Sequence, residues 1–268
     1  MNTNSRNLTL LTDLYELTMM QGYFKTHSKE HVVFDVFYRQ NPCGGAYAIA
    51  CGLDQAIDYI KDLHFEQEDI DYLRSTGFFQ EDFLDYLKSF RFTGDIYAIP
   101  EGTIIFPKEP LVKVIAPIME AQLVETALLN INHQSLIATK AARVVQEAGG
   151  GVMEFGLRRA QGPDAGIYGA RAAVIAGCIG TSNVLAGQMF DIPVKGTHAH
   201  SWIMSFPSEL EAFRTYAELF PDNCLLLVDT YDTLNSGVKH AIQVFREMRE
   251  KGIHSKLFGI RLDSGDLA

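Results

Sequence analysis

The pattern of apolar and polar positions changes character about halfway along the chain. The first half mixes strand-like and helix-like patterns. Residues 32–39 and 47–50 are rich in β-branched and aromatic side chains and predict strands, and a β pattern broken by prolines runs over 94–117. Apolar side chains three and four positions apart predict short helices at 53–63, 66–74 and 81–90. We therefore predict an N-terminal α+β domain over residues 1–130.

Two further helical regions flank this β-rich part. Asp13 followed three residues later by Glu16 is a capping-box pattern, typical of a helix that begins here and runs to about residue 24. Tyr15 lies in its first turn, where half-buried packing is the simplest expectation. The second region spans 120–148, with a bend near 130–132, and three consecutive glycines end it.

Five short apolar segments then alternate with helical patterns. The predicted strands are 152–155, 178–181, 193–197, 224–228 and 256–262. Strands that alternate with helices are typical of a parallel sheet, and polar or charged side chains follow each of the five. In α/β barrels the carboxyl ends of the strands carry the active site. We therefore predict that residues 131–268 form the first part of an α/β barrel that carries the active site.

The composition is that of a globular protein without affinity for membranes or nucleic acid. Of the 268 residues, 47% are hydrophobic and 21% charged, and no apolar run is long enough to span a bilayer. The first residues lack the apolar segment of a signal peptide, and the four cysteines form no C-x-x-C pair, so we expect a cytoplasmic protein with reduced thiols. The net charge of −10 argues against nucleic-acid binding and requires a locally positive cleft for any anionic substrate.

Two histidines, His198 and His200, lie at the end of the third predicted strand. In an extended backbone they would point the same way, whereas a turn between them would leave only one facing the site. Two alternatives stay open. One is a histidine packed in the core, and the other is a metal pair, although no Cys or acidic ligand lies nearby at a usual spacing. The strand end favours a nucleophilic or acid–base histidine.

The strand ends also carry charged side chains that suit a phosphate-bearing ligand. The basic ones are Arg158, Arg159, Lys195 and Arg261. Arginine matches phosphate or carboxylate oxygens with two parallel hydrogen bonds. The acidic ones, which could hold Mg²⁺ or bind ribose hydroxyls, are Asp229, Asp232, Asp263 and Asp266. A surface salt-bridge role is the alternative for the two adjacent arginines. Helix capping is the alternative for four of the residues at the strand ends: Ser182, Asn183, Asp232 and Ser264.

Four segments of the chain closely resemble nicotinate phosphoribosyltransferase. They are Leu11-Thr-Asp-Leu-Tyr15, Glu154-Phe-Gly-Leu-Arg-Arg-Ala-Gln-Gly162, Gly196-Thr-His-Ala-His-Ser201 and Gly259-Ile-Arg-Leu-Asp-Ser-Gly-Asp266. The resemblance implies a type II phosphoribosyltransferase, in which an α+β domain precedes an irregular, TIM-like α/β barrel. Barrel closure needs about eight strands. With five predicted strands, we expect the barrel to be incomplete in this chain.

The resemblance also implies an activity in NAD biosynthesis. Such enzymes transfer the 5-phosphoribosyl group from phosphoribosyl diphosphate to nicotinate, forming nicotinate mononucleotide and pyrophosphate. They hydrolyse ATP alongside, through a phosphohistidine. ATP is therefore the implied co-substrate, and Mg²⁺ is the ion expected to accompany ATP and phosphoribosyl diphosphate. The implied assembly is a homodimer with shared active sites.

Individual residues take their expected roles from the same resemblance. His200 matches the phosphorylated histidine. Tyr15 matches an aromatic residue that a neighbouring subunit offers to the nicotinate ring, and Phe155 matches the ring on its other face in nicotinamide-using relatives. Two residues match contacts to nicotinate, Thr197 and Arg261.

Three further residues complete the expected site. Arg158 matches a contact to the base or a phosphate. Ser182 stands where the nicotinamide-using enzymes have an Asp, which predicts a preference for the acid over the amide. Asp263 is the carboxylate that we expect to stabilise an oxocarbenium-like transition state at the sugar.

Two other functions compete with this one. Another barrel enzyme, such as an aldolase or isomerase acting on a phosphorylated substrate, would need a desolvated lysine at a strand end for Schiff-base chemistry. Lys195 is the only candidate, and it precedes the end of its strand. A non-catalytic fragment that keeps only binding surfaces is the second alternative, and a nicotinamide-using enzyme is a variant of the first function.

Overall fold

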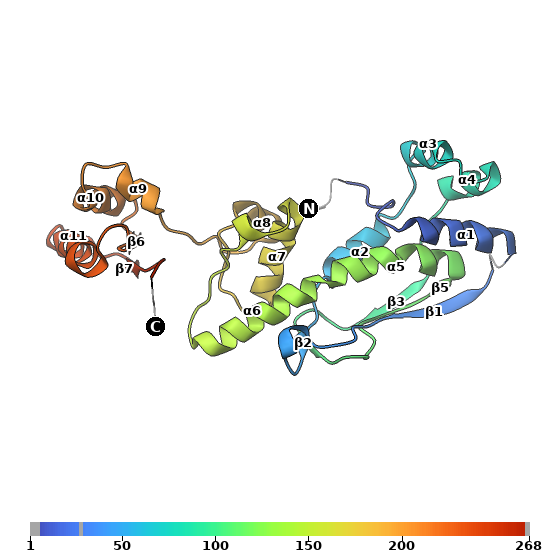
Figure 1. The fold of residues 1–268 in the computed structure, drawn as a ribbon, viewed down its shortest axis with the longest axis horizontal. Coiled ribbons are helices and arrows are strands. Elements are labelled where there is room, and N and C mark those ends of the chain that lie inside the picture. The colour runs from blue at the N-terminus through green and yellow to red at the C-terminus, as the bar shows by residue number, and fades with distance from the viewer. Residues whose placement is uncertain (1–5, 27–28, 266–268) are drawn as a thin grey trace. The chain divides into compact units, whose positions relative to one another are not determined.

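The computed structural model describes residues 6–26 and 29–265, which fold into two compact units, Met1–Lys195 and Gly196–Ala268 (Figure 1). Each unit is described by itself. These units are defined by contacts within the chain. The domain boundary that we predict at residue 130 is a different division and stays a prediction. Within the described residues, no helix is long and apolar enough to cross a bilayer.

Two antiparallel sheets form the β part of the first unit. The larger has the strand order β1-β5-β3, and its strands are β1 (His31–Val36), β5 (Val112–Pro117) and β3 (Asp95–Ala98). The smaller pairs β2 (Ala48–Ile49) with β4 (Ile104–Ile105). On β5 the buried side chains alternate with partly exposed ones, as expected for a strand that covers the core with one face. The predicted strands of the first half are therefore confirmed.

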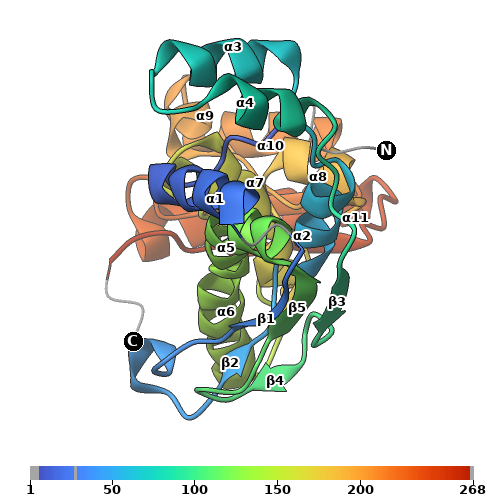
Figure 2. The ribbon, with the colours of Figure 1, turned by 90° about the vertical axis from the view of Figure 1, so that its right-hand side faces the viewer.

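A long helix covers the larger sheet. α5 (Ile118–Asn132) contacts β1, β5 and the first helix α1 (Leu14–Thr26), and α6 (Gln134–Ala148) follows it after His133 (Figure 2). The predicted break near 130–132 is thereby confirmed. Most of α5 is buried, because the helix lies between the sheet and α1.

Glu16 has a different role from the one that its spacing predicts. Its side chain is fully buried, and its carboxylate accepts hydrogen bonds from Gln122 and from Thr126, both on α5. A capping box would satisfy backbone groups within the same helix. Glu16 instead joins α1 to a helix more than a hundred residues away in sequence.

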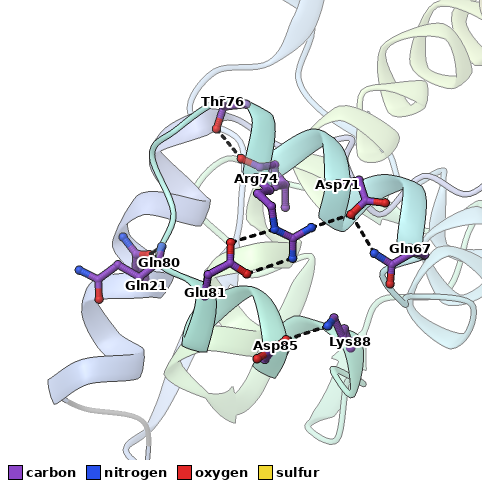
Figure 3. A network of polar contacts seen from close by, with 10 residues as sticks. Gln21, Gln67, Asp71, Arg74, Thr76, Gln80, Glu81, Asp85 and Lys88 are labelled. Carbon is purple, nitrogen blue, oxygen red and sulfur yellow. Dashed lines mark hydrogen bonds and ion pairs between the residues drawn. The ribbon is translucent and has the colours of Figure 1, made fainter.

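Three short helices confirm the periodicity of residues 53–90. They are α2 (Leu53–Lys61), α3 (Gln67–Ser75) and α4 (Glu81–Lys88). On the surface between α3 and α4, Arg74 donates to both carboxylate oxygens of Glu81 and to Asp71 (Figure 3). Such exposed pairs contribute little to stability. The buried side chains of these helices, Ile70, Leu73, Phe83, Leu84 and Leu87, attach them to the core of the first unit.

The first three strands predicted for the second half are much shorter than expected. Residues Glu154, Thr181 and Val194 form only isolated parallel bridges, in that order. Gly180 shows how closely these segments approach, because a Cβ there would lie 2.5 Å from the carbonyl oxygen of Pro193. The predicted parallel order is correct, whereas the predicted strand lengths are wrong. The helices that follow, α7 (Pro163–Ile175) and α8 (Val184–Phe190), form as predicted.

The second unit is built on two parallel strands, β6 (Asn223–Leu227) and β7 (Leu257–Arg261). Its helices are α9 (His200–Met204), α10 (Glu209–Leu219), the π-helix η3 (Thr233–Gly237) and α11 (Val238–Glu250). Side chains of α10, β6 and α11, among them Phe213, Leu226 and Val244, form its core. Two 3₁₀ turns complete the structure in the first unit, Pro42–Gly44 and Leu157–Arg159. Over the described residues, the strands close no barrel. The two units, each taken by itself, give a mixed α/β fold with an N-terminal α+β part.

Candidate active site

Polar side chains gather where β6 and β7 end. Because the two strands are parallel, with Leu227 opposite Arg261, their carboxyl ends lie at the same edge. The residues that follow, together with those before α9, make up what we call the strand-end cluster: Thr197, His200, Asp229, Thr230, Arg261, Asp263 and Ser264. All of them belong to the second unit.

His200 is the imidazole of this cluster. Its Nδ1 lies 3.0 Å from the Thr230 hydroxyl oxygen, within hydrogen-bond distance. Its Nε2 lies 3.7 Å from Asp263 Oδ2 and 3.9 Å from Asp229 Oδ1, which is too far for a hydrogen bond. The side chain is 36% exposed. One ring nitrogen is therefore held, while the other faces two carboxylates and is accessible to a reacting group.

Asp229 is an almost completely buried carboxylate beside this ring. Its Oδ2 accepts hydrogen bonds from the Asp263 backbone N–H at 2.6 Å and from the Ser264 hydroxyl at 2.8 Å. Burial would raise the pKa of Asp229, but these hydrogen bonds outweigh it and hold the pKa below its usual value. A carboxylate next to His200 whose pKa is lowered in this way would stabilise a positive charge on the imidazole.

Arg261 connects the two sides of the cluster. It donates from Nη1 to the Thr197 hydroxyl at 2.9 Å and from Nη2 to Asp263 Oδ1 at 2.6 Å. The guanidinium charge is therefore shared with Asp263. An incoming carboxylate would meet an arginine that is already paired but still partly exposed, and it would compete with Asp263 for the guanidinium.

His198 lies in a different environment although it is only two residues from His200. Its Nε2 accepts a hydrogen bond from the Leu227 backbone N–H at 3.3 Å, and its ring packs edge-on against Tyr216 with centroids 4.5 Å apart. Burial lowers the pKa of His198 to about 4. Of the two cases considered, the turn is confirmed: the chain turns into α9 at His200, and only one of the two rings faces the strand-end cluster. The alternative of a core histidine holds for His198.

The other expected site residues lie in the first unit. Phe155 and Ser182 occupy neighbouring parallel segments, since the Ser182 N–H donates to the carbonyl of Glu154 at 2.9 Å. Arg158 lies exposed in the 3₁₀ turn Leu157–Arg159. Tyr15 is half exposed in the first turn of α1, and the neighbouring Glu16 raises its pKa. The structure thus brings Phe155 and Ser182 onto neighbouring segments, whereas Tyr15 lies on the helix α1.

Capping does not explain Ser182. The cap of α8 is Asn183, whose Oδ1 accepts from the Ala186 N–H at 3.1 Å and whose Nδ2 donates to the Gly166 carbonyl. Among the described residues, the Ser182 hydroxyl has no hydrogen-bond partner. Its side chain is therefore available for a ligand, and the structural alternative considered for it is wrong.

The aspartates expected to hold Mg²⁺ divide into three kinds. Asp232 caps η3 by accepting from the backbone N–H groups of Leu234 and Asn235, so helix capping accounts for it. Asp266 lies outside the described residues. Asp229 and Asp263 both turn an oxygen toward His200, and within the part of the chain that the structure describes Asp229 Oδ1 is buried without a hydrogen-bond partner.

These two carboxylates fit Mg²⁺ that arrives with a phosphate-bearing substrate. The described residues contain no group of three or more His, Cys, Asp or Glu side chains that could hold a metal ion by themselves. Mg²⁺ commonly binds through one or two carboxylates together with substrate phosphates, which is the donor set that Asp229 and Asp263 offer.

The partners of His200 were the part of the site that sequence reasoning missed. Asp229 was assigned to Mg²⁺ or ribose rather than to the imidazole, and Thr230 was not singled out. The only signal available was their place directly after a buried apolar segment, 224–228. That signal indicates that a strand ends there. It does not indicate that His200, about thirty positions earlier in the chain, would face the residues at this strand end.

Comparison with known proteins identifies the family of the chain. A family model described as nicotinate phosphoribosyltransferase (NAPRTase) N-terminal domain matches residues 10–132, and one described as nicotinate phosphoribosyltransferase (NAPRTase) family matches residues 151–268. The chain is 48% identical to a nicotinate phosphoribosyltransferase of Mycobacterium tuberculosis over 260 residues, which cover 96% of this chain and 55% of that protein. It is also 48% identical to the nicotinate phosphoribosyltransferase of Bacillus subtilis, over 98% of this chain and 53% of that protein.

A solved structure shows the same fold. The crystal structure of human nicotinic acid phosphoribosyltransferase matches with a TM-score of 0.86 and 33% identity, over 96% of this chain and 61% of that one. The fold and the strand-end cluster thus define a phosphoribosyltransferase-like α/β protein. More particularly, the chain belongs to the nicotinate phosphoribosyltransferase family. It spans about half the length of the curated relatives that it matches.

Proposed function

We propose that this chain serves the transfer of the 5-phosphoribosyl group from phosphoribosyl diphosphate to nicotinate, giving nicotinate mononucleotide and pyrophosphate with coupled ATP hydrolysis. The supporting observation is the geometry of His200, with Nδ1 held by Thr230 and Nε2 facing Asp229 and Asp263, in a chain of this family. The irregular α/β barrel remains the architecture that we propose for the residues around this site.

In the ATP-coupled step, Nε2 of His200 would attack the γ-phosphorus of ATP. The bond from that phosphorus to the β–γ bridging oxygen breaks, ADP leaves, and the phosphoryl group stays on the imidazole. Thr230 fixes the ring through Nδ1, so the reacting nitrogen keeps one direction. The Asp229 carboxylate stabilises the positive charge that develops on the ring as Nε2 forms the new bond. Water later cleaves the phosphohistidine and releases phosphate.

In the glycosyl-transfer step, the bond between the sugar and the diphosphate breaks while the nicotinate nitrogen approaches the same carbon. The sugar passes through an oxocarbenium-like state, and the nearby Asp263 carboxylate would stabilise its positive charge. Mg²⁺ held by Asp229 and Asp263 would supply positive charge for the leaving pyrophosphate. Arg261 and Thr197 would contact the nicotinate carboxylate, Arg158 the base or a phosphate, and Phe155 one face of the ring.

Selectivity for nicotinate over nicotinamide is assigned to Ser182. Its hydroxyl is free of helix capping and can donate a hydrogen bond to a carboxylate, whereas an Asp would place like charges in contact. Ser182→Asp should therefore reduce turnover of nicotinate far more than that of nicotinamide, by roughly 2–4 kcal/mol, or tens- to several-hundred-fold. Ser182→Asn is the matched control, because asparagine has nearly the same size as aspartate but carries no charge. Equal losses for the two bases would show that Ser182 does not discriminate them.

Sharing of the site between subunits is a separate proposal, supported by the half-exposed Tyr15 on α1. In a homodimer, Tyr15 would complete the site of the neighbouring subunit. Mixing an inactive Tyr15→Ala variant with an inactive His200→Ala variant should restore part of the activity through hybrid sites. No recovery, with subunit exchange demonstrated by mass-tagged chains, would exclude sharing.

The function as a whole is tested by product formation. The 268-residue chain is supplied with nicotinate, phosphoribosyl diphosphate, ATP and Mg²⁺, alone and together with the part of the Bacillus subtilis enzyme that it does not cover. Nicotinate mononucleotide in either assay supports the proposal. Binding of substrates without product in both assays would favour a non-catalytic fragment. Borohydride trapping of a carbonyl substrate on Lys195 would favour the other barrel chemistry.

A cytoplasmic location fits the cysteines. All four are free, three of them are buried, and reduced thiols of this kind are typical of the cytosol.

A further inference from the structure

A second polar cluster lies in the same unit, outside the strand-end cluster. Glu209 is the first residue of α10, and its side chain is only 3% exposed. Its Oε2 accepts a hydrogen bond from the Ser236 hydroxyl at 2.5 Å and one from His240 Nδ1 at 2.8 Å. Its Oε1 is buried and has no hydrogen-bond partner among the described residues. We call these three residues the Glu209 cluster.

The local needs of α10 do not explain this buried carboxylate. The helix is already capped by Ser208, whose hydroxyl oxygen accepts from the Glu211 N–H at 3.2 Å. Burying a carboxylate with one oxygen unpaired costs free energy, and an apolar side chain would be cheaper at a purely structural position. Both donors lie on a different part of the chain, 27 and 31 residues further on. The Glu209 cluster therefore serves the contact between α10 and that segment.

The anchored segment is the π-helix η3 and the start of α11. Ser236 lies inside η3, where the N–H groups of Ser236 and Gly237 both donate to the carbonyl of Asp232. π-helical turns are rare and occur mostly at functional sites. The hydrogen bonds that Glu209 accepts from Ser236 and His240 fix this turn and the start of α11 from outside.

Gly237 brings η3 directly against the end of β6. A Cβ at this position would lie 1.9 Å from the carbonyl oxygen of Val228, so only glycine allows the approach. Val228 immediately precedes Asp229 and Thr230, which both face His200. A displacement of η3 would therefore move the backbone that carries both of them.

We infer that Glu209 is a positioning residue for the His200 site. Through Ser236 and His240 it holds η3 against β6, and η3 in turn fixes Thr230 and Asp229 beside the imidazole. The inference concerns the geometry of His200 and rests on the proposed function only where it predicts a rate. Its effect is to be distinguished from a general loss of stability.

The test compares variants of Glu209 with a matched control on the same helix. Glu209→Ala removes both hydrogen bonds, while Glu209→Gln keeps an oxygen that can accept from Ser236 and His240. Ser208→Ala removes the cap of α10 without touching η3 and should lower the melting temperature modestly. Each variant is assessed by its melting temperature and by the ¹H–¹⁵N signals of the His200 ring, assigned with His200→Gln.

The expected result is a change in the His200 ring signals for Glu209→Ala, recovery in Glu209→Gln, and unchanged signals in Ser208→Ala. The rate of histidine phosphorylation from ATP should follow the same order. Glu209→Ala should lower it by between about 10- and 100-fold, the range expected when a reacting group is misplaced. The ATP concentration for half-maximal rate should stay unchanged, because Glu209 does not contact ATP in this scheme.

Three outcomes would overturn the inference: His200 signals in Glu209→Ala that match the wild type, signals in Ser208→Ala that shift equally, or no recovery in Glu209→Gln. If Glu209→Ala does not fold, Ser236→Ala decides, since it removes one donor and should shift the same signals by a smaller amount. If the wild type forms no phosphohistidine, the proposed function fails, while the ring signals still decide whether Glu209 positions His200.

Discussion

His198 and His200 are two residues apart in sequence, yet their surroundings in the folded chain are very different. His198 is buried, accepts a hydrogen bond from a strand N–H and packs against Tyr216. His200 is partly exposed, is held by a hydroxyl and faces two carboxylates. Burial makes the first imidazole a neutral part of the core, whereas the second has one ring nitrogen held and the other directed at two carboxylates, as the proposed reaction requires. The chemistry of a histidine is therefore decided by its environment rather than by the motif that contains it.

The largest difference between the two regions should appear in phosphorylation by ATP. His200→Ala removes the proposed acceptor nitrogen, so incorporation of label from γ-labelled ATP should fall by about 10³-fold or more, to background. The label in the wild type should be acid-labile and base-stable. The matched control is His198→Gln, which should still be labelled wherever it folds. Labelling of His200→Ala at the wild-type level, with loss in His198→Gln, would reverse the assignment of the two rings.

Stability should show the opposite pattern. His198→Ala removes a buried ring and leaves the Leu227 N–H without its acceptor, so the free energy of unfolding should fall by about 3–4 kcal/mol. His200→Ala removes a partly exposed side chain and should change it by less than about 1 kcal/mol. Urea unfolding at pH 7.5 measures both. Comparable losses in the two variants would mean that the rings do not differ in structural role.

Acid should destabilise the chain through His198 in particular. The pKa of His198 in the folded state is lowered to about 4 from 6.5, so the unfolded chain binds more protons between these values. Its contribution is complete above pH 6.5 and is lost as the pH falls toward 4, by ~3 kcal/mol in total. The difference in unfolding free energy between wild type and His198→Gln, measured across this range, isolates the effect from other titrating groups. A difference independent of pH would show that His198 is protonated normally.

The smallest effect concerns the orientation of His200. Thr230→Val removes the hydroxyl beside Nδ1 at nearly constant volume, at a cost of about 1 kcal/mol for one hydrogen bond, or roughly fivefold in the rate of phosphorylation. Thr233→Val, in the same segment but without a hydrogen bond to His200, serves as control and should leave the rate unchanged. If both variants behave like the wild type, the Thr230 contact does not orient the ring.

Much of the fold could be predicted because it depends on short-range patterns. The helices α2, α3 and α4 follow from apolar spacing within a few turns, and α7 and α10 follow from the alternation of helical and apolar segments. The caps Asn183 and Asp232 were recognisable as candidates because a cap accepts from N–H groups two or three residues away. The place of polar groups at the ends of β6 and β7 also followed, since it needs only the order of strand and helix along the chain.

The predictions that failed involve partners far away in sequence. Glu16 has the spacing of a capping box, yet its carboxylate binds side chains of α5, and the competition between local and distant donors is not visible in the spacing. Residues 152–155, 178–181 and 193–197 have strand-like composition, but they approach one another only at single bridges, where Gly180 allows close contact. Strand length depends on the neighbouring segment as much as on the strand itself.

The sequence by itself determined the family, the helices and the set of polar groups that surround the proposed reaction, because each of these is encoded in residues close together along the chain. Only the tertiary structure decided which imidazole faces the carboxylates, that Arg261 is paired with Asp263, and that Glu209 accepts hydrogen bonds from the segment beside β6. Burial and hydrogen bonding at these positions depend on residues that are far apart in sequence. Thr197 and Arg261, for example, are 64 positions apart. Contacts at such separations exist only once the chain has folded, and they set the charge and direction of each side chain.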